Sequence, residues 1–194
     1  KILLQQSAST VKKVSMELGG HAPFVVFEDA NIDEAVNGAM QSKFRNSGQT
    51  CICANRIFVH EKVYDEFLNK FTQEVNKIKV GNGLEEGIVS GPLIDQPSLM
   101  KVLDQVKDAV NQGAKIAVGG DIHPLGGNFF QPTVLSNVTT EAKITYEETF
   151  GPVAPLYKFR TDEEVIKLAN DTPYGLASYF YSRDIGRIWR VAEA

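Results

Sequence analysis

Apolar and polar residues follow two alternating patterns along the chain, and these patterns predict its secondary structure. Short runs rich in Val, Ile and Phe are typical of strands, whereas apolar residues that recur every three or four positions are typical of amphipathic helices. The predicted strands are residues 22–27, 56–60, 115–118, 153–159 and 175–181. The predicted helices are residues 31–44, 64–78, 99–110 and 165–169, with a further helix from residue 185. Because strand and helix alternate over the whole length, we expect an α/β domain with a mainly parallel sheet flanked by helices.

Polar residues mark where two of these helices begin. Asn31 is followed three residues later by Glu34, and Thr161 by Glu164. This spacing is typical of a capping box, in which the first side chain accepts a hydrogen bond from a free backbone N–H of the first turn. We therefore expect a helix to start at each pair.

Charge and composition narrow the possible partners. The chain has 194 residues, with 20 Lys and Arg against 24 Asp and Glu, so its net charge is −4. A mildly acidic chain gives no electrostatic basis for binding nucleic acid or an anionic membrane. No apolar stretch approaches the roughly 18 residues that a membrane-spanning helix needs. Two cysteines are too few for a disulfide framework, which indicates a reducing compartment and predicts a cytoplasmic location.

From its two ends we expect the sequence to be a piece of a larger protein. It begins at Lys1 without a Met or a signal-like segment. It stops at Ala194 inside a run of apolar residues at helical spacing.

A candidate nucleophile stands in the segment 44–56, FRNSGQTCICANR. Cys51 follows a Gly-Gln-Thr stretch directly after a predicted helix, in a loop where a thiol could be exposed. A nucleophilic cysteine must be accessible and partly ionised, so it needs nearby donors or positive charge. Arg45 is the close cation upstream. The alternative is that Cys51 is a small buried hydrophobe, as most free cysteines are.

A candidate general base stands in the segment 15–23, SMELGGHAP. Glu17 is followed by Leu-Gly-Gly, which puts a carboxylate beside backbone that can approach a ligand closely. A carboxylate in an apolar setting has a raised pKa and can act as a general base. The alternative is a surface glutamate at the end of a strand. Glu17 and Cys51 are 34 residues apart, so only the fold can bring them together.

Together with a third motif, these segments resemble the aldehyde dehydrogenase family. The three motifs stand in the family's order: residues 17–20 (ELGG), residues 46–51 (NSGQTC) and residues 148–152 (ETFGP). The similarity extends over essentially all 194 residues. It implies that residues 20–194 form a three-layer α/β catalytic domain. It also implies that residues 1–19 are the end of an NAD(P)-binding domain, with a helix end and a strand leading to Glu17.

The resemblance also implies a role for each motif residue. Cys51 would attack a small-molecule aldehyde, and Glu17 would activate the water that hydrolyses the resulting thioester. Glu148 would bind the nicotinamide ribose of NAD or NADP, and Phe150 would pack near the nicotinamide ring. Lys101 falls where family members often place another ribose contact, although a surface lysine on a helix is the alternative. The resemblance further implies a homodimeric or homotetrameric parent enzyme, and an isolated 194-residue chain that does not oxidise aldehydes.

The substrate is indicated by Arg45, which lies six residues before Cys51. The segment FRNSGQTCIC resembles the succinate-semialdehyde dehydrogenase branch of the family, whose members bind the distal carboxylate of the substrate with an arginine at this position. A guanidinium recognises a carboxylate with two parallel hydrogen bonds. The alternatives are an arginine that interacts only with the end of its helix, and a betaine-aldehyde or broad-range enzyme.

The Cys51-Ile52-Cys53 sequence predicts redox control. In that branch a second thiol two residues from the nucleophile also occurs, and a disulfide between the two would block catalysis reversibly. The alternative is that Cys53 packs on the core side of the loop. The three histidines are scattered without ligand spacing, so we expect no metal site.

Two other classes of function remain open at this point. Cys51 and Glu17 could serve a thiol hydrolase without a cofactor, although such an enzyme has no need of the nicotinamide motif at residues 148–152. The chain could also be a non-catalytic binding module, in which case Cys51 would react no faster than a free thiol.

Overall fold

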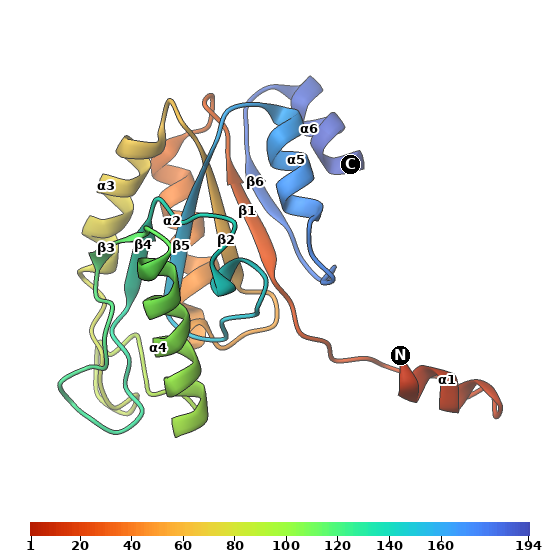
Figure 1. The fold of residues 1–194 in the computed structure, drawn as a ribbon, viewed down its shortest axis with the longest axis horizontal. Helices are drawn as coiled ribbons and strands as arrows, with labels where there is room; N and C mark the ends of the chain where they lie inside the picture. The colour runs from red at the N-terminus through yellow and green to blue at the C-terminus, as the bar shows by residue number, and fades with distance from the viewer.

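Six strands form one sheet in the computed structural model, which describes all 194 residues. The strands are β1 (Ala22–Val26), β2 (Ala54–His60), β3 (Lys115–Val118), β4 (Thr133–Ser136), β5 (Val153–Phe159) and β6 (Tyr179–Tyr181). Their order is β3-β4-β5-β2-β1-β6, and every neighbouring pair is parallel except β3 and β4 (Figure 1). The expectation of a mainly parallel sheet is confirmed.

Helices cover both faces of this sheet. They are α2 (Ile32–Phe44), α3 (Tyr64–Val75), α4 (Gln96–Asn111), α5 (Asp162–Asn170) and α6 (Ile185–Glu193), whereas α1 (Ile2–Ala8) lies apart from the sheet (Figure 1). Side chains of one strand point alternately to opposite faces, and β1 shows how this builds two cores. Phe24 and Val26 pack with α2 and α3, whereas Val25 and Phe27, just past its end, pack with α4 and α5. The result is the expected three-layer α/β arrangement.

Both predicted helix starts are confirmed. The Asn31 side chain accepts hydrogen bonds from the N–H groups of Asp33 and Glu34, at 3.2 and 3.4 Å. The Thr161 hydroxyl accepts one from the N–H of Glu164 at 3.2 Å. Each cap satisfies donors that have no partner inside the helix.

The last strand is shorter than predicted, since only Tyr179–Tyr181 of residues 175–181 belong to it. Phe24 of β1 is in register with Tyr179 of β6. The preceding residue of β1 is Pro23, which has no N–H to donate, so the ladder cannot continue toward residue 175.

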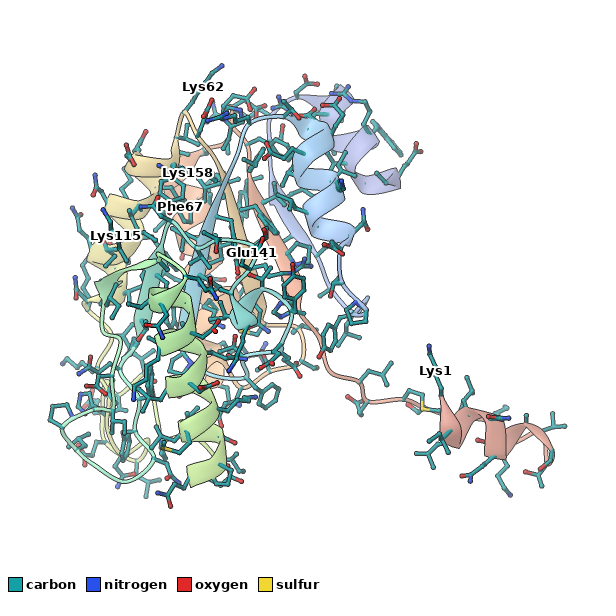
Figure 2. All side chains as sticks on the ribbon, in the orientation of Figure 1. Lys1, Lys62, Phe67, Lys115, Glu141 and Lys158 are labelled. Carbon is teal, nitrogen blue, oxygen red and sulfur yellow. The ribbon has the colours of Figure 1, made fainter.

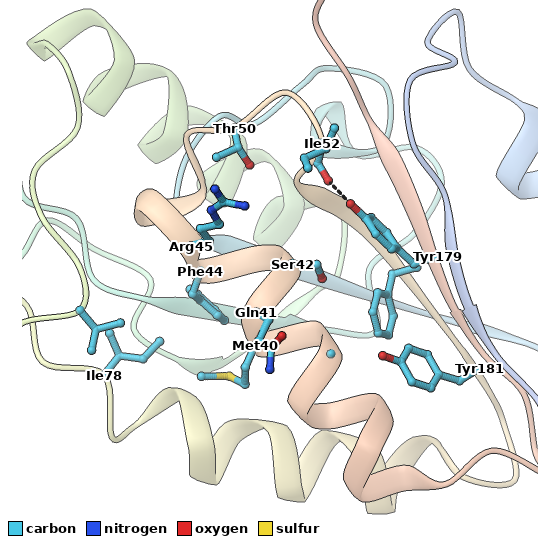
Figure 3. A pocket seen from close by; sticks show the side chains of 13 residues that line it. Met40, Gln41, Ser42, Phe44, Arg45, Thr50, Ile52, Ile78, Tyr179 and Tyr181 are labelled. Atoms are coloured by element: carbon cyan, nitrogen blue, oxygen red, sulfur yellow. Dashed lines mark hydrogen bonds between the residues drawn. The ribbon is translucent and has the colours of Figure 1, made fainter.

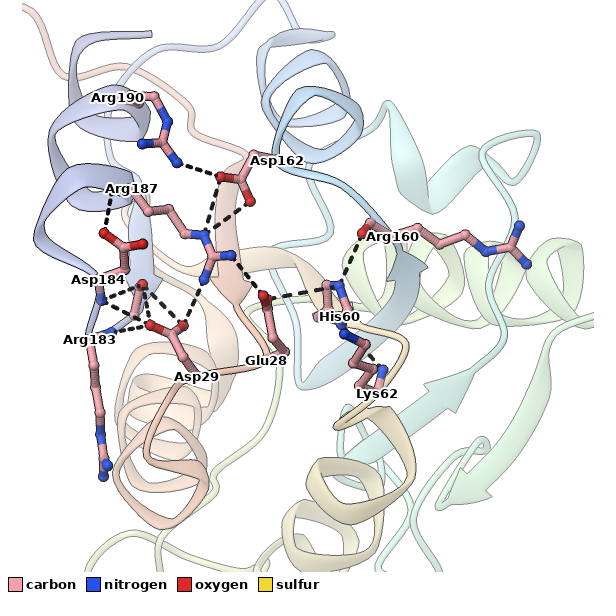
Figure 4. Close-up of polar contacts among 11 residues, drawn as sticks. Glu28, Asp29, His60, Lys62, Arg160, Asp162, Arg183, Asp184, Arg187 and Arg190 are labelled. Carbon is pink, nitrogen blue, oxygen red and sulfur yellow. Dashed lines mark hydrogen bonds and ion pairs between the residues drawn. The ribbon is translucent and has the colours of Figure 1, made fainter.

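Arg187 holds helix α6 against the sheet, because its guanidinium donates hydrogen bonds to three carboxylates (Figure 4). The partners are Glu28 at 2.8 Å, Asp29 at 2.9 Å and Asp162 at 3.0 Å. The same guanidinium lies over the Phe27 ring, 4.7 Å from its centroid. Because Arg187 is only 13% exposed, these contacts are shielded more than those of a surface ion pair.

The N-terminal residues stand apart from the rest of the fold. Helix α1 contains no buried residue, and Ile2 and Leu3 are 72% and 71% exposed. Figure 1 shows α1 joined to β1 by an extended segment, and Figure 2 shows side chains from Lys1 onward projecting into solvent. The expected strand leading to Glu17 is wrong: residues 12–21 belong to no strand, because a strand exists only through hydrogen bonds to a neighbour. None of the helices combines the length and the apolar composition needed to cross a bilayer.

Candidate functional site

Four segments meet at one edge of the sheet because each directly precedes a parallel strand. The three motifs precede β1, β2 and β5, and residues 172–178 precede β6. Strands β5, β2, β1 and β6 are consecutive neighbours, so their amino ends lie side by side. Ligands of open α/β sheets commonly bind at the carboxyl ends of the strands, whereas the motifs of this chain gather at the amino ends.

The segment that carries Cys51 is a strained turn. After α2 ends, Asn46 and Ser47 have φ of 50° and 56°, in the left-handed region, and Gly48 follows with φ of 73°. A non-glycine residue held there costs on the order of 1–3 kcal/mol and persists only where its surroundings enforce it. The Ser47 hydroxyl supplies part of that enforcement, because it accepts the N–H of Gly91 at 2.9 Å and donates to the Gly91 carbonyl at 3.1 Å.

Two glycines allow the motifs to touch. A Cβ added to Gly20 would lie 1.8 Å from the carbonyl oxygen of Cys51, and one added to Gly48 would lie 2.1 Å from the carbonyl oxygen of Gly151. The Gly20 N–H donates to Oε1 of Glu148 at 2.8 Å. Gly20 thus contacts the predicted nucleophile through its α-carbon and the predicted ribose ligand through its amide.

The predicted cofactor residues lie together beside this junction. Lys101 reaches from α4 and donates its ammonium to the carbonyl oxygen of Glu148 at 3.2 Å. Glu148 is partly buried, and its Oε2, on the side of Gly19, has no hydrogen bond within the chain. Phe150 has φ of 50°, which for an aromatic residue is an outlier of the kind found at functional sites. One carboxylate oxygen is therefore anchored and the other is available to a donor such as a ribose hydroxyl.

Arg45 lies at a cavity of about 690 Å³ between α2, the Cys51 turn and β6 (Figure 3). Its walls are mostly apolar, and Thr50, Ile52, Tyr179 and Tyr181 are among the residues that line it. The Arg45 side chain is exposed and makes no hydrogen bond or ion pair within the chain. A free guanidinium at the rim of an apolar cavity is suited to an elongated ligand with an anionic end.

The two cysteines differ in environment. Cys51 is partly exposed, as a nucleophile must be, whereas Cys53 is fully buried. The Cys53 thiol donates to the carbonyl oxygen of Lys43 at 3.3 Å. Burial lowers the pKa of the Lys43 ammonium, and the neighbouring thiol of Cys53 opposes that shift. Cys53 therefore packs on the core side of the loop, the alternative that its position left open.

Glu17, like Arg45, is a predicted site residue whose side chain has no partner within the chain. It is exposed on the extended segment and makes no hydrogen bond or ion pair. It stands three residues before Gly20, the residue that lies against the Cys51 carbonyl oxygen. The fold thus joins Cys51, Glu148, Phe150 and Lys101 at one place, with Glu17 on the segment that leads to it.

Several residues of the site belong to no motif, so no signal in the sequence would identify them. The rings of Tyr174 and Tyr179, from the segment before and within β6, lie against Gly19 and the Cys51 turn. His21 is buried and donates its Nε2 hydrogen to the Thr145 carbonyl at 2.8 Å. Burial lowers the pKa of His21 to about 4, so this imidazole is neutral at pH 7.

Comparison with known proteins decides the family. A model of the aldehyde dehydrogenase family matches residues 1–194. The chain belongs to the aldehyde dehydrogenase family. It is 54% identical to an NADP-dependent succinate-semialdehyde dehydrogenase of Escherichia coli and 56% identical to a 3-sulfolactaldehyde dehydrogenase of Pseudomonas putida, over 99% and 100% of its length. The crystal structure of a succinate-semialdehyde dehydrogenase from Burkholderia pseudomallei superposes with a TM-score of 0.96, at 56% identity, over 99% of the chain.

The chain spans about 40% of the length of each of these relatives. The family oxidises aldehydes through a cysteine thioester and uses NAD or NADP. The expected resemblance and fold are therefore confirmed at the level of the family.

Proposed function

We propose that the chain is the catalytic part of an NAD(P)-dependent aldehyde dehydrogenase that oxidises succinate semialdehyde to succinate. The observation that carries this proposal is the junction at Gly20, where the Cys51 turn and the Glu148 carboxylate contact the same residue. In this proposal residues 20–194 are the catalytic domain, and residues 1–19 are the end of the NAD(P)-binding domain. The exposure of α1 and of the segment after it supports that division.

Cys51 is the nucleophile in this proposal. Its thiolate adds to the aldehyde carbon and forms a thiohemiacetal, whose oxyanion accepts a hydrogen bond from the backbone N–H of Cys51. The strained turn at Asn46, Ser47 and Gly48 leads directly to the segment that carries this N–H. A bound nicotinamide supplies the hydride acceptor for oxidation to the thioester. Glu17 then takes a proton from the water that attacks the thioester, and the carboxylic acid leaves.

The cofactor half of the site rests on Glu148, Phe150 and Lys101. The free Oε2 of Glu148 would accept a hydrogen bond from a ribose hydroxyl, and Phe150 would pack against the nicotinamide ring. Lys101 holds the main chain of Glu148 through its carbonyl oxygen, so its contribution is to orient the carboxylate in addition to any contact of its own.

Substrate choice rests on Arg45. The two relatives named above act on succinate semialdehyde and on 3-sulfolactaldehyde, which are aldehydes with a carboxylate or a sulfonate at the far end. A free guanidinium beside an apolar cavity can pair with either anion while the aldehyde reaches Cys51. A betaine-aldehyde enzyme would have to bind a cationic end, which Arg45 disfavours, and a broad-range enzyme would make no use of it.

The experiment compares two arginine variants in the full-length protein. Arg45→Ala is expected to raise KM for succinate semialdehyde about tenfold or more, as loss of a charge-assisted pair implies, and to leave KM for a neutral aldehyde such as propanal unchanged. Arg183→Ala is the control, because Arg183 is also exposed, its side chain makes no hydrogen bond or ion pair, and it lies outside the cavity. Equal effects of Arg45→Ala on both aldehydes would contradict the assignment of the substrate.

Cofactor dependence separates the proposal from a thiol hydrolase. Cys51→Ala is expected to abolish NAD(P)H formation, and ester hydrolysis that proceeds at full rate without any nucleotide would favour the hydrolase. Labelling of Cys51 no faster than a free thiol would favour a binding module.

Three further points belong to the same proposal. The enzyme is a homodimer or homotetramer located in the cytoplasm, and its two free cysteines suit a reducing compartment. A disulfide between Cys51 and Cys53 would regulate it. Because Cys53 is fully buried, the disulfide requires the loop to open, and mass spectrometry after mild peroxide treatment tests for it.

A further inference from the structure

Tyr179 connects the far end of the chain to the turn that carries Cys51. Its hydroxyl donates to the carbonyl oxygen of Ile52 at 2.8 Å, across 127 residues of sequence. Figure 3 shows this bond at the wall of the cavity that Arg45 also lines. The bonded carbonyl belongs to the residue that directly follows Cys51.

The other contacts of this turn come from different directions. Gly20 lies against the carbonyl oxygen of Cys51, and the N–H of Cys53 donates to the carbonyl oxygen of Thr50 at 3.1 Å. The Cys53 side chain is buried in the core. The Ile52 side chain is 43% exposed, so packing does little to hold this residue. The bond from Tyr179 therefore fixes the backbone of the turn at its exposed point.

The ring of Tyr179 is itself held in place. Tyr179 and Phe24 are register partners on β6 and β1, and their ring centroids lie 6.1 Å apart. Burial raises the pKa of Tyr179, and the nearby thiols of Cys53 and Cys51 raise it further. The hydroxyl consequently keeps its proton and remains a donor throughout the pH range in which a dehydrogenase works.

We propose that Tyr179 is a positioning residue that holds the Cys51 turn in its reactive conformation through the Ile52 carbonyl. This inference rests on the proposed role of Cys51 as nucleophile. The bond lies in the wall of the cavity, but it involves neither the Cys51 thiol nor the Arg45 guanidinium. Loss of the bond should thus slow the attack by Cys51 and leave substrate binding unchanged.

Tyr179→Phe in the full-length protein tests this, because it removes the hydroxyl and keeps the ring. The control is Tyr146→Phe: Tyr146 is exposed, lies outside the cavity and makes no hydrogen bond through its hydroxyl. A typical net hydrogen bond corresponds to about a threefold to tenfold effect. We expect Tyr179→Phe to lower kcat and the pre-steady-state rate of NAD(P)H formation by that factor. KM for succinate semialdehyde should stay within twofold and Tm within about 2 °C, and Tyr146→Phe should match the wild type.

Two results would overturn the inference. One is a Tyr179→Phe rate equal to that of the wild type, and the other is an equal loss in Tyr146→Phe. A Cys51→Ala variant assayed alongside keeps the two proposals apart. If that variant still forms NAD(P)H, the proposed nucleophile is wrong; if it is inactive and Tyr179→Phe is fully active, only the role of Tyr179 is wrong.

Discussion

Gly20 offers the sharpest test of how the site is built, because the space it leaves is occupied by the Cys51 backbone. A Cβ at position 20 would lie 1.8 Å from the Cys51 carbonyl oxygen, and real Cβ atoms essentially never come closer than 3.0 Å to another atom. Gly20→Ala must therefore move the two segments apart by about 1.2 Å, the difference between these distances. The obstacle is main chain, which no rotamer change can displace.

The expected magnitude follows from that displacement. Misplacing a reacting group by about 1 Å can lower a rate about 100-fold, which is roughly 2.7 kcal/mol of transition-state stabilisation. Overpacking also destabilises a fold by about 1–3 kcal/mol. We expect Gly20→Ala to reduce kcat about 100-fold in the full-length protein, with a fall in the free energy of unfolding in that range.

Two other glycines provide graded controls. A Cβ at Gly19 would lie 2.9 Å from Oε2 of Glu148, the end of a flexible side chain, whereas a Cβ at Gly83 meets nothing within 4 Å. Neither glycine has a positive φ. We expect Gly83→Ala to stay within about 0.5 kcal/mol of the wild type in stability and about twofold in kcat. Gly19→Ala should raise KM for the cofactor more than it lowers kcat.

The assay is steady-state NAD(P)H formation, with urea unfolding of each variant in parallel. Activity of Gly20→Ala within threefold of the wild type, at unchanged stability, would refute the reasoning, because the turn would then have room that the structure denies it. A loss of equal size in Gly83→Ala would show that the effect comes from the loss of glycine flexibility and not from contact with Cys51.

Three further outcomes are expected. Arg187→Gln should lower the free energy of unfolding by about 2–3 kcal/mol, between the values for exposed and buried ion pairs. Burial raises the pKa of Glu28 and Asp29, but hydrogen bonds and the charge of Arg187 outweigh it, so the pKa of each carboxyl is lowered on balance. The stability that these two carboxylates contribute is thus present above about pH 4.5 and lost on acidification. Urea unfolding at pH 5 and pH 3 should therefore show a smaller loss of stability on acidification in Arg187→Gln than in the wild type. Folding lowers the pKa of His21 from 6.5 to about 4. The stability that depends on its neutral form is complete above pH 6.5 and falls by roughly 3 kcal/mol toward pH 4. His21→Gln should therefore flatten the dependence of the free energy of unfolding on pH between these two values. The purified 194-residue chain alone should form no NAD(P)H from succinate semialdehyde, and measurable formation would contradict the assignment of residues 1–19 to a separate cofactor domain.

The position of the site was implicit in the sequence, although no single motif revealed it. The predicted strands at residues 22–27, 56–60 and 153–159 are confirmed, and each begins within a few residues of a motif. In a parallel sheet such starts share one edge, so neighbouring strands suffice to bring Cys51 and Glu148 together. What the pattern did not contain was the strand order, because that order depends on packing between distant segments.

Backbone strain and long-range hydrogen bonds could not be predicted from the sequence, for a physical reason. Nothing in the pattern marks Phe150 or Ser47 as left-handed, because that conformation is unfavourable for either residue and arises only from surrounding contacts. In the sequence Tyr179 is only one aromatic residue of a predicted strand. Its hydrogen-bond acceptor is a main-chain carbonyl, which any residue would provide. The burial of Cys53 likewise depends on which side of the turn faces the core, which the two-residue spacing from Cys51 leaves open.

These features together explain why the reactive cysteine stands on a turn that its own residues disfavour. An unstrained loop would relax to several conformations, and Cys51 would spend little time in the one that attacks an aldehyde. Here the left-handed residue Ser47 is bonded to Gly91, the Cys51 carbonyl abuts Gly20, and Tyr179 holds the following carbonyl. Each restraint comes from a different part of the chain, so the turn adopts its shape only after the sheet has assembled. The reactive conformation is thus a property of the tertiary structure, and the NSGQTC segment by itself does not encode it.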